Sequence, residues 1–319
     1  MEYLSIKLTN DMAVGKWKGS KAGKCGPTLS HIFFADDLIF VSKATLTNAQ
    51  YLKDTLDFFC SRFGFDQMVN SAKSKILFSS NVDQNTKDNI CHTLGYQQTN
   101  ELSKYLGIPI SVKRCSKANC QFILDKICSK LSGWKTKFFS IVGRATLVSF
   151  VLASIPNYFM QVMWLPYFVH KEIDRISKNF LWGFVDSQRK IHLVDWNTIC
   201  KPKAHGGLGF HSIHDANIVA ISKLNWRIHT KKENIWREVL VKKYNINDFH
   251  YTPPSSTSLV LKNISKGTPL FISGIKWVPQ NGSLVHFWFD HWVGKATLDS
   301  ILVGPLIRNA SNILLADVF

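Results

Sequence analysis

The sequence lacks the cysteine patterns that hold small secreted domains together or bind zinc. Its seven cysteines are odd in number, are irregularly spaced and include no Cys-x-x-Cys pair. We therefore expect no disulfide framework and no zinc ribbon, and reduced thiols in an intracellular protein are the default. Cys200 and three nearby histidines fit no metal-ligand spacing, so no metal is expected there; these are His205, His211 and His214.

Long apolar runs are also scarce. The amino terminus shows no basic segment followed by an apolar one, so no secretory signal is predicted. The most apolar stretch, residues 141–156, is interrupted by Arg144 and is too short to span a bilayer. We expect a core helix there and no membrane partner. The sequence leaves the cellular compartment open.

Acidic residues are few relative to basic ones. Lys and Arg number 39 against 22 Asp and Glu, which gives a formal charge of +17 at pH 7. This charge favours a polyanionic partner, nucleic acid or an anionic membrane surface, although a basic surface that only aids solubility is the simpler alternative. With 45% hydrophobic and 13% aromatic residues, the 319-residue chain can bury the core of one large domain or two smaller ones.

Two adjacent aspartates, Asp36 and Asp37, lie between short apolar runs at residues 32–34 and 38–41. This pattern predicts a β-hairpin with the acidic pair at its turn. Carboxylates on a tight turn can bind a magnesium ion, which prefers oxygen ligands, and two-metal nucleotidyl transfer uses such a site. A solvated acidic turn without a metal is the alternative.

An amphipathic helix is predicted after the hairpin, capped by Thr47 or Asn48. Its apolar stripe consists of Ala49, Leu52, Leu56, Phe59 and Phe63. Residues 75–78 indicate a strand, residues 105–110 a compact turn, and the Gly- and Lys-rich residues 11–30 a loop.

From about residue 116 to 181 the apolar spacing predicts helices. Their other faces are basic and include Lys126, Lys130, Lys135, Lys137 and Arg144. The remainder gives mixed signals: a Gly-rich turn at 206–209, a helix near 215–245, and short strands around the tryptophans at 277, 288 and 292. The fold class is therefore α+β, a small α+β unit followed by a helical, basic one.

An ordered series of motifs resembles the carboxy-terminal part of plant LINE-type (non-LTR) retrotransposon reverse transcriptases. Residues 31–40, HIFFADDLIF, resemble the motif that carries two catalytic aspartates, and Tyr105-Leu-Gly-Ile-Pro109 resembles the primer grip. The resemblance continues through a thumb-like and a connector-like region in the order of the family. These motifs are Leu131-Ser-Gly-Trp134, Gly143-Arg-Ala-Thr146, Asn179-Phe-Leu-Trp-Gly183, Gly206-Gly-Leu-Gly209 and Asp290-His-Trp292.

The resemblance implies a partial palm at residues 1–112, a helical basic thumb at 113–200 and a connector at 201–319. It implies RNA-directed DNA polymerisation with Mg²⁺ and deoxynucleotides on an RNA or DNA primer-template, with the nucleus as a compartment. Asp36 and Asp37 would bind the metal, Lys73 would act on the leaving pyrophosphate, and the thumb-like basic residues would follow the phosphate backbone. The primer grip would comprise Tyr105, Leu106, Gly107 and Pro109.

The family's third catalytic aspartate has no counterpart in the sequence. Glu2 is expected on a helix and Asp11 in the loop after it, and neither matches the missing position. We therefore expect a truncated form that binds nucleic acid but does not polymerise alone. The alternatives are a non-enzymatic interaction fragment and a polymerase that is active only when a separate amino-terminal piece completes it.

Overall fold

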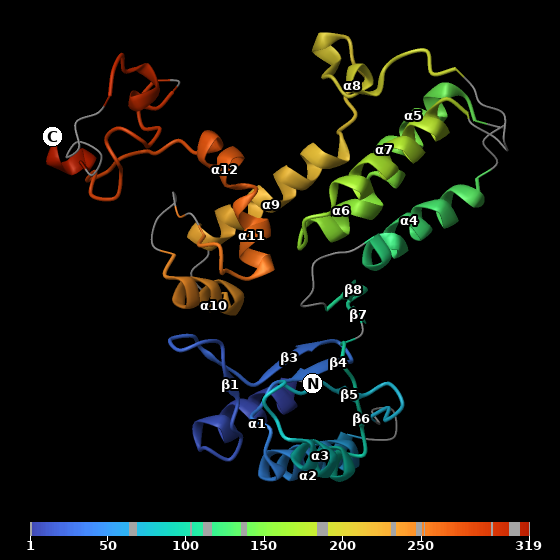
Figure 1. The fold of residues 1–319 in the computed structure, drawn as a ribbon, viewed down its shortest axis with the longest axis vertical. Helices are drawn as coiled ribbons and strands as arrows, with labels where there is room; N and C mark the ends of the chain where they lie inside the picture. The colour runs from blue at the N-terminus through green and yellow to red at the C-terminus, as the bar shows by residue number, and fades with distance from the viewer. Residues whose placement is uncertain are drawn as a thin grey trace. The chain divides into compact units, whose positions relative to one another are not determined.

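The computed structural model (Figure 1) is α+β, with helices and four two-stranded sheets among the residues that it describes. These residues are 2–63, 69–102, 104–110, 117–134, 139–183, 191–230, 234–246, 251, 253–294, 296–305 and 313–318. The chain forms two compact units. The first comprises Met1–Gly133 and Lys231–Asn247, and the second Trp134–Thr230 and Asp248–Phe319. The boundaries of the palm-like, thumb-like and connector-like regions at residues 112 and 200 come from the family resemblance and stay a prediction.

The first unit begins with helix α1 and two antiparallel hairpins. Their bounds are α1 Glu2–Ala13, β1 Ser20–Lys21, β2 Thr28–Leu29, β3 His31–Phe34 and β4 Asp37–Phe40. A parallel strand pair and a third hairpin follow, flanked by helices. These are α2 Leu46–Phe63, β5 Lys75–Ile76, α3 Gln84–Leu94, β6 Gln97–Gln98, β7 Lys104–Tyr105, β8 Ile108–Pro109, α4 Lys117–Ser132 and α10 Ile235–Tyr244.

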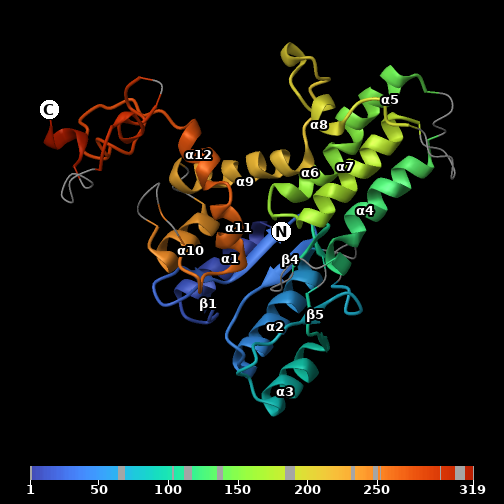
Figure 2. The ribbon, with the colours of Figure 1, turned by 45° about the horizontal axis from the view of Figure 1, so that its top comes forward.

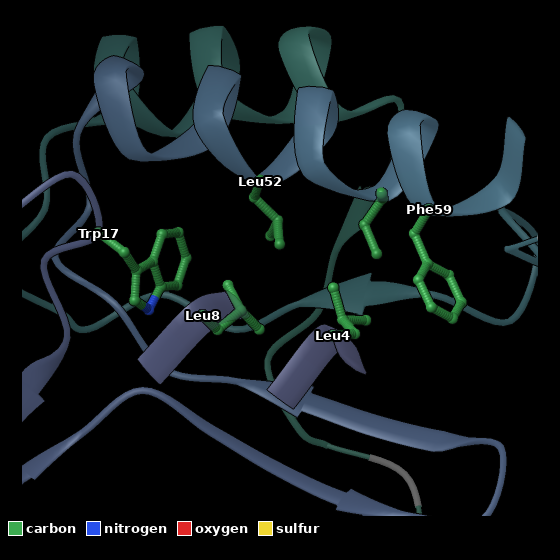
Figure 3. Packing of buried hydrophobic residues seen from close by; sticks show 6 residues of the cluster. Leu4, Leu8, Trp17, Leu52 and Phe59 are labelled. Carbon is green, nitrogen blue, oxygen red and sulfur yellow. The ribbon is translucent and has the colours of Figure 1, made fainter. Parts of the chain in front are cut away.

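The core of the first unit forms where α1 and α2 pack on one face of the β3–β4 hairpin. Leu52 and Phe59 point from α2 toward Leu4 and Leu8 of α1, and Trp17 closes one end of the cluster (Figure 3). Phe33, Leu38 and Phe40 pack against these residues from the hairpin. Burial of so many apolar side chains, each contributing roughly 1.5–3 kcal/mol, holds the hairpin in place.

The predicted helix is present as α2, but its cap differs from the prediction. The Thr45 Oγ1 atom accepts a hydrogen bond from Asn48 N at 3.3 Å, and the Thr45 carbonyl accepts from Ala49 N. Thr45 therefore caps the helix, and the prediction of Thr47 or Asn48 was wrong. The Asn48 amide is 3% exposed and binds the backbone of Lys18 and Lys43 instead.

Two other local predictions are corrected. The loop predicted over residues 11–30 contains the end of α1 and the β1–β2 hairpin. The strand at 75–78 is confirmed only over Lys75–Ile76, where it pairs in parallel with Gln97–Gln98.

The second unit is helical in its described part. Its helices are α5 Ile141–Leu147, η2 Val148–Leu152, α6 Ser154–Met160, α7 Tyr167–Leu181, α8 Trp196–Ile199, η3 Lys203–His205, α9 Ile213–Thr230, α11 Leu259–Ser265, α12 Thr268–Gly274, η4 Leu298–Ile301 and η6 Leu315–Asp317. Helix α9 runs through this unit and contacts α6, α7, α11 and α12 (Figure 2). Its buried isoleucines, Ile213, Ile221 and Ile228, supply its apolar stripe.

The apolar run beginning at Ile141 is one helix that contains a π-helical turn. Pro156 has no N–H for the Leu152 carbonyl, and its ring would crowd that carbonyl in a regular α-helix. A π turn at Val148–Leu152, closed by an Ala153 N to Val148 O bond, accommodates the proline.

This helix differs from the core helix that we expected. It continues over 20 residues, Ile141–Met160, and is long and apolar enough to cross a bilayer by length and composition. In its most apolar window only 17% of the residues are buried. Val142 and Phe150 are 70% and 75% exposed. The predicted absence of a membrane partner stays a prediction.

Three further expectations are corrected in the second half of the chain. The single helix near 215–245 is two helices, α9 and α10. The predicted carboxy-terminal strands are wrong, because the described residues there form turns and one isolated bridge between His286 and Leu314. Cys120 is disulfide-bonded, whereas the other described cysteines form no disulfide, so not every thiol is reduced.

Candidate active site

The acidic pair lies at the turn of the β3–β4 hairpin, as predicted. Phe34 pairs with Asp37 across the hairpin, so Ala35 and Asp36 form a two-residue loop. Ala35 has a φ of 52°, which costs roughly 1 kcal/mol for a residue with a Cβ atom. The packed core beneath the strands holds this turn, because the hairpin's buried face fixes its register.

Alternation along β4 separates the acidic pair from the core. Leu38 and Phe40 face the α1–α2 core, and Asp37 lies on the opposite, exposed face, where Phe34 is 58% exposed. Both carboxylates are exposed, and neither makes an ion pair with any described residue. They are free to accept a hydrated cation at the surface.

Within the described part of the chain, no third acidic residue joins the pair. Among the described residues no group of three or more His, Cys, Asp or Glu side chains is arranged to hold a metal. Glu2 lies on α1 as predicted, but Asp11 is in the last turn of α1 and not in a loop.

The Asp11 side chain belongs to a different polar cluster, between α1 and α2. Its carboxylate accepts hydrogen bonds from Lys7 Nζ at 2.8 Å and from the Tyr51 hydroxyl. Hydrogen bonding from Lys7, and then from Tyr51, lowers the pKa of Asp11. The ionised carboxylate thus joins α1 to α2 beneath the hairpin.

His31 fixes the start of the hairpin against α1. Its Nε2 atom lies 2.7 Å from the Ser5 hydroxyl and its Nδ1 atom 2.8 Å from the Ser30 hydroxyl. Burial lowers the pKa of His31. The ring is therefore a neutral positioning group for β3.

Lys73 lies in an exposed turn before β5. Asn70 builds this turn, because its Oδ1 atom accepts hydrogen bonds from Ala72 N and Lys73 N at 3.1 Å each. No ion pair joins Lys73 to an acidic residue in the described part of the chain. Its role at pyrophosphate stays a prediction.

The primer-grip-like residues form the β7–β8 hairpin. Leu106 and Gly107 have φ values of 51° and 76°, which is the pattern of a type I′ turn. Tyr105 pairs with Ile108 and Lys104 with Pro109. The Lys104 ammonium lies 4.8 Å from the Phe122 ring centre and links the hairpin to α4.

The five basic thumb-like residues do not share one described surface. Lys126 and Lys130 are exposed on α4 in the first unit, where they flank the stripe that contains the buried Ile123 and Ile127. Lys135 and Lys137 lie outside the described residues.

Arg144 belongs to the second unit, and its guanidinium packs against the backbone at Gly183. A Cβ atom on Gly183 would lie 1.9 Å from an Arg144 terminal nitrogen. The Arg144 Nε atom is buried without a hydrogen-bond partner. Contact between Arg144 and phosphate stays a prediction.

A buried polar cluster in the second unit escaped the sequence analysis. The Asn217 side chain is fully buried, and its Oδ1 atom accepts from Leu165 N at 2.8 Å and lies 3.1 Å from His170 Nε2. Its Nδ2 atom donates to the Met163 carbonyl at 3.1 Å. Burial lowers the pKa of His170, so the neutral ring carries its proton on Nε2.

Acidic and thiol groups near this cluster are shifted by burial. Loss of solvation raises the pKa of Asp174 to about 6, although the Asp174 carboxylate accepts a hydrogen bond from Ile213 N. Burial likewise raises the pKa of Cys200 to about 11, which makes it an inert thiol. The signal in the sequence was Asn217 itself, four residues from Ile213 and from Ile221 on the apolar stripe of α9.

Comparisons with known proteins place the chain beside two proteins of Arabidopsis thaliana. One, named "Putative ribonuclease H protein", is 36% identical over 198 residues, which are 60% of this chain and 32% of the relative. The chain's match thus spans about a third of that protein's length. The other, named "Uncharacterized mitochondrial protein", is 24% identical over 147 residues, which are 45% of this chain and 96% of the relative. No family model matches the chain.

Proposed function

We propose that the chain derives from a retrotransposon of the LINE type and is a reverse-transcriptase-like, nucleic-acid-binding protein. The observation that carries the proposal is the exposed pair Asp36 and Asp37 on a two-residue hairpin turn whose other face is buried. Similarity to a protein named for ribonuclease H supports a nucleic-acid context.

The acidic pair supplies part of a magnesium site. Carboxylate oxygens suit Mg²⁺, which keeps several waters and takes one or two carboxylates from a protein. The bound ion would stabilise charge on phosphate oxygens during nucleotidyl transfer. With two carboxylates the site would hold the ion weakly, so the chain alone would bind a primer-template without extending it.

The exposed lysines of α4 would contact the phosphate backbone. Lys126 and Lys130 are exposed beside the stripe that Ile123 and Ile127 bury, within reach of a ligand on this side of the helix. Contacts of this kind tolerate any sequence and weaken as salt rises, because binding releases condensed counterions.

Primer extension on a primed RNA template with Mg²⁺ tests the catalytic part. We expect no extension by the chain alone. Asp36→Asn and an exposed control, Asp57→Asn, are assayed in parallel. Extension that disappears in Asp36→Asn and persists in Asp57→Asn would overturn the assignment of inactivity.

Binding to the same template in a salt titration tests the other part. We expect Lys126→Gln with Lys130→Gln to lower the steepness of the log affinity against log salt by about 1–2. The matched control is Lys53→Gln with Lys75→Gln, which removes the same charge from other exposed positions of the first unit. No binding by the wild-type chain at low salt would remove the nucleic-acid assignment.

A further inference from the structure

A second basic surface lies on the first unit, away from α4 in the sequence. It consists of residues 16–29, which include the β1–β2 hairpin, together with Lys43; we name it the basic arm. From Met12 to Ala35 the chain has no Asp or Glu, while Lys16, Lys18, Lys21 and Lys24 fall in that span.

The arm has a fixed backbone. Trp17 is 1% exposed and anchors the arm in the α1–α2 core. The buried Asn48 amide donates to the carbonyls of Lys18 at 3.1 Å and Lys43 at 3.0 Å, and Lys43 N donates to the Lys18 carbonyl at 3.1 Å. These bonds hold Lys18 and Lys43 side by side from segments 25 residues apart.

Glycines close the hairpin tightly. A Cβ atom on Gly19 would lie 2.4 Å from the Leu29 carbonyl oxygen, and one on Gly26 would lie 2.0 Å from that of Ala22. Gly23 has a φ of 90° and lies against the Lys243 stem of α10. The arm therefore needs glycine at these positions, and Lys243 adds a further exposed cation at its tip.

The charges of four arm lysines are not paired within the part of the chain that the structure describes. Lys18, Lys21, Lys24 and Lys43 are exposed, and none forms an ion pair with a described residue. Uncompensated lysines on an ordered backbone form a surface for polyanions, because less conformational freedom is lost when the ligand binds.

We propose that the basic arm is a nucleic-acid-binding site that contacts the phosphate backbone independently of α4. This inference rests on the proposed function for the identity of the polyanion. The arm presents neutral and cationic groups but no carboxylate, so it would engage phosphates without selecting a base sequence.

The test compares two variants of equal charge. One carries Lys18→Gln, Lys21→Gln, Lys24→Gln and Lys43→Gln. The control carries Lys53→Gln, Lys75→Gln, Lys201→Gln and Lys223→Gln, all of them exposed and outside the proposed sites. Affinity for an RNA–DNA hybrid of about 20 base pairs is measured across a salt series, and circular dichroism establishes that both variants fold.

We expect the arm variant to bind about tenfold or more weakly at 0.1 M salt, with the slope of log affinity against log salt reduced by about 2–3. The control should lose less than about threefold. Replacing the four arm lysines by arginine should retain the wild-type slope. An arm variant that matches the control overturns the inference.

Two comparisons within this experiment separate this inference from the proposed function. If wild type binds the hybrid and only the α4 variant changes the slope, the arm is not a site although the proposed function stands. If wild type does not bind the hybrid, the proposed function fails. Arm-dependent binding to phosphatidylserine vesicles without arm-dependent binding to the hybrid would assign the arm to a membrane surface and overturn the proposal.

Discussion

The two units hold their central elements by different means. In the first, the hairpin that carries Asp36 and Asp37 rests on apolar side chains from α1 and α2. In the second, α9 buries Asn217 and Asn225 on the same stripe as its isoleucines, and their amides bind backbone groups of neighbouring segments. The first arrangement fixes a surface by shape and area, the second by directed hydrogen bonds.

The difference predicts how each unit tolerates substitution. An apolar cluster accepts a side chain of similar volume at a small cost, because dispersion and burial are not directional. A buried amide accepts no apolar replacement of its size, because its partners would stay buried and unpaired. Hydrogen exchange of peptides from each unit can follow the two effects separately.

Leu8→Ala should have the largest effect. Leu8 is fully buried in the cluster beneath the hairpin, so truncation leaves a cavity and should lower the free energy of unfolding of the first unit by about 3 kcal/mol. Hydrogen exchange should accelerate in α1, α2 and the β3–β4 hairpin. Leu8→Met, which keeps the volume, should cost less than about 1.5 kcal/mol.

Ile6→Ala is the control on the same helix. Ile6 is 54% exposed, and its truncation should change stability by no more than about 0.5 kcal/mol. Equal losses for Leu8→Ala and Ile6→Ala would contradict the assignment of the core to this cluster.

Asn217→Ala should follow, at about 2–3 kcal/mol, because it leaves Leu165 N and the Met163 carbonyl without their partner. Faster exchange should appear in α7, α9 and the segment between α6 and α7. Asn217→Leu should cost a similar amount, unlike the volume-conserving swap at Leu8.

The exposed Asn157 on α6 provides the control, since Asn157→Ala should be nearly neutral. Rescue of stability by leucine at position 217 would show that this site depends on volume, and the contrast between the units would fail.

Sequence spacing could predict the first unit better than the second, because an apolar core leaves a periodic pattern in the sequence and buried hydrogen bonds do not. Leu52, Leu56 and Phe59 repeat at helical intervals, and apolar runs on either side of Asp36 and Asp37 define the hairpin; both were confirmed. The cap of α2 was missed because Asn48 could bind locally or, as it does, to Lys18 thirty residues away. Propensity contains no information on such distant partners.

The second unit and the candidate site were predicted less completely, because their contacts join residues whose pairing no local pattern shows. Asn217 and His170 meet across 47 residues, and no local pattern places them together. At the site, sequence located the acidic turn, but spacing could not indicate that Asp11 binds Lys7 and Tyr51 or that Arg144 packs against Gly183. Single charged residues give no periodic signal, so their partners come only from the fold.

Asp174 should give the smallest effect on stability, and this effect in the second unit depends on pH. Burial raises the pKa of this carboxyl from 3.8 to about 6 in the folded state, so the folded protein holds the proton more tightly than the unfolded chain does. Its contribution to stability is present below about pH 4 and is lost as pH rises through about 6. Asp174→Asn removes that loss and can still accept the hydrogen bond from Ile213 N at the start of α9.

Chemical unfolding of wild type and Asp174→Asn between pH 4 and 7 measures the effect. The stability of the variant relative to wild type should increase with pH by on the order of 1 kcal/mol, since the carboxyl is only partly buried and solvent screens it. His170 acts in the opposite direction, because its lowered pKa destabilises the fold as pH falls, but it is common to both proteins and cancels in the difference. Asp57→Asn controls for the loss of one negative charge. The difference in stability between Asp174→Asn and wild type could instead stay constant or shrink as pH rises. That result would mean that burial at α7 and α9 does not set the ionisation of Asp174. The second unit would then be less firmly packed around its polar groups than the hydrogen bonds of Asn217 require.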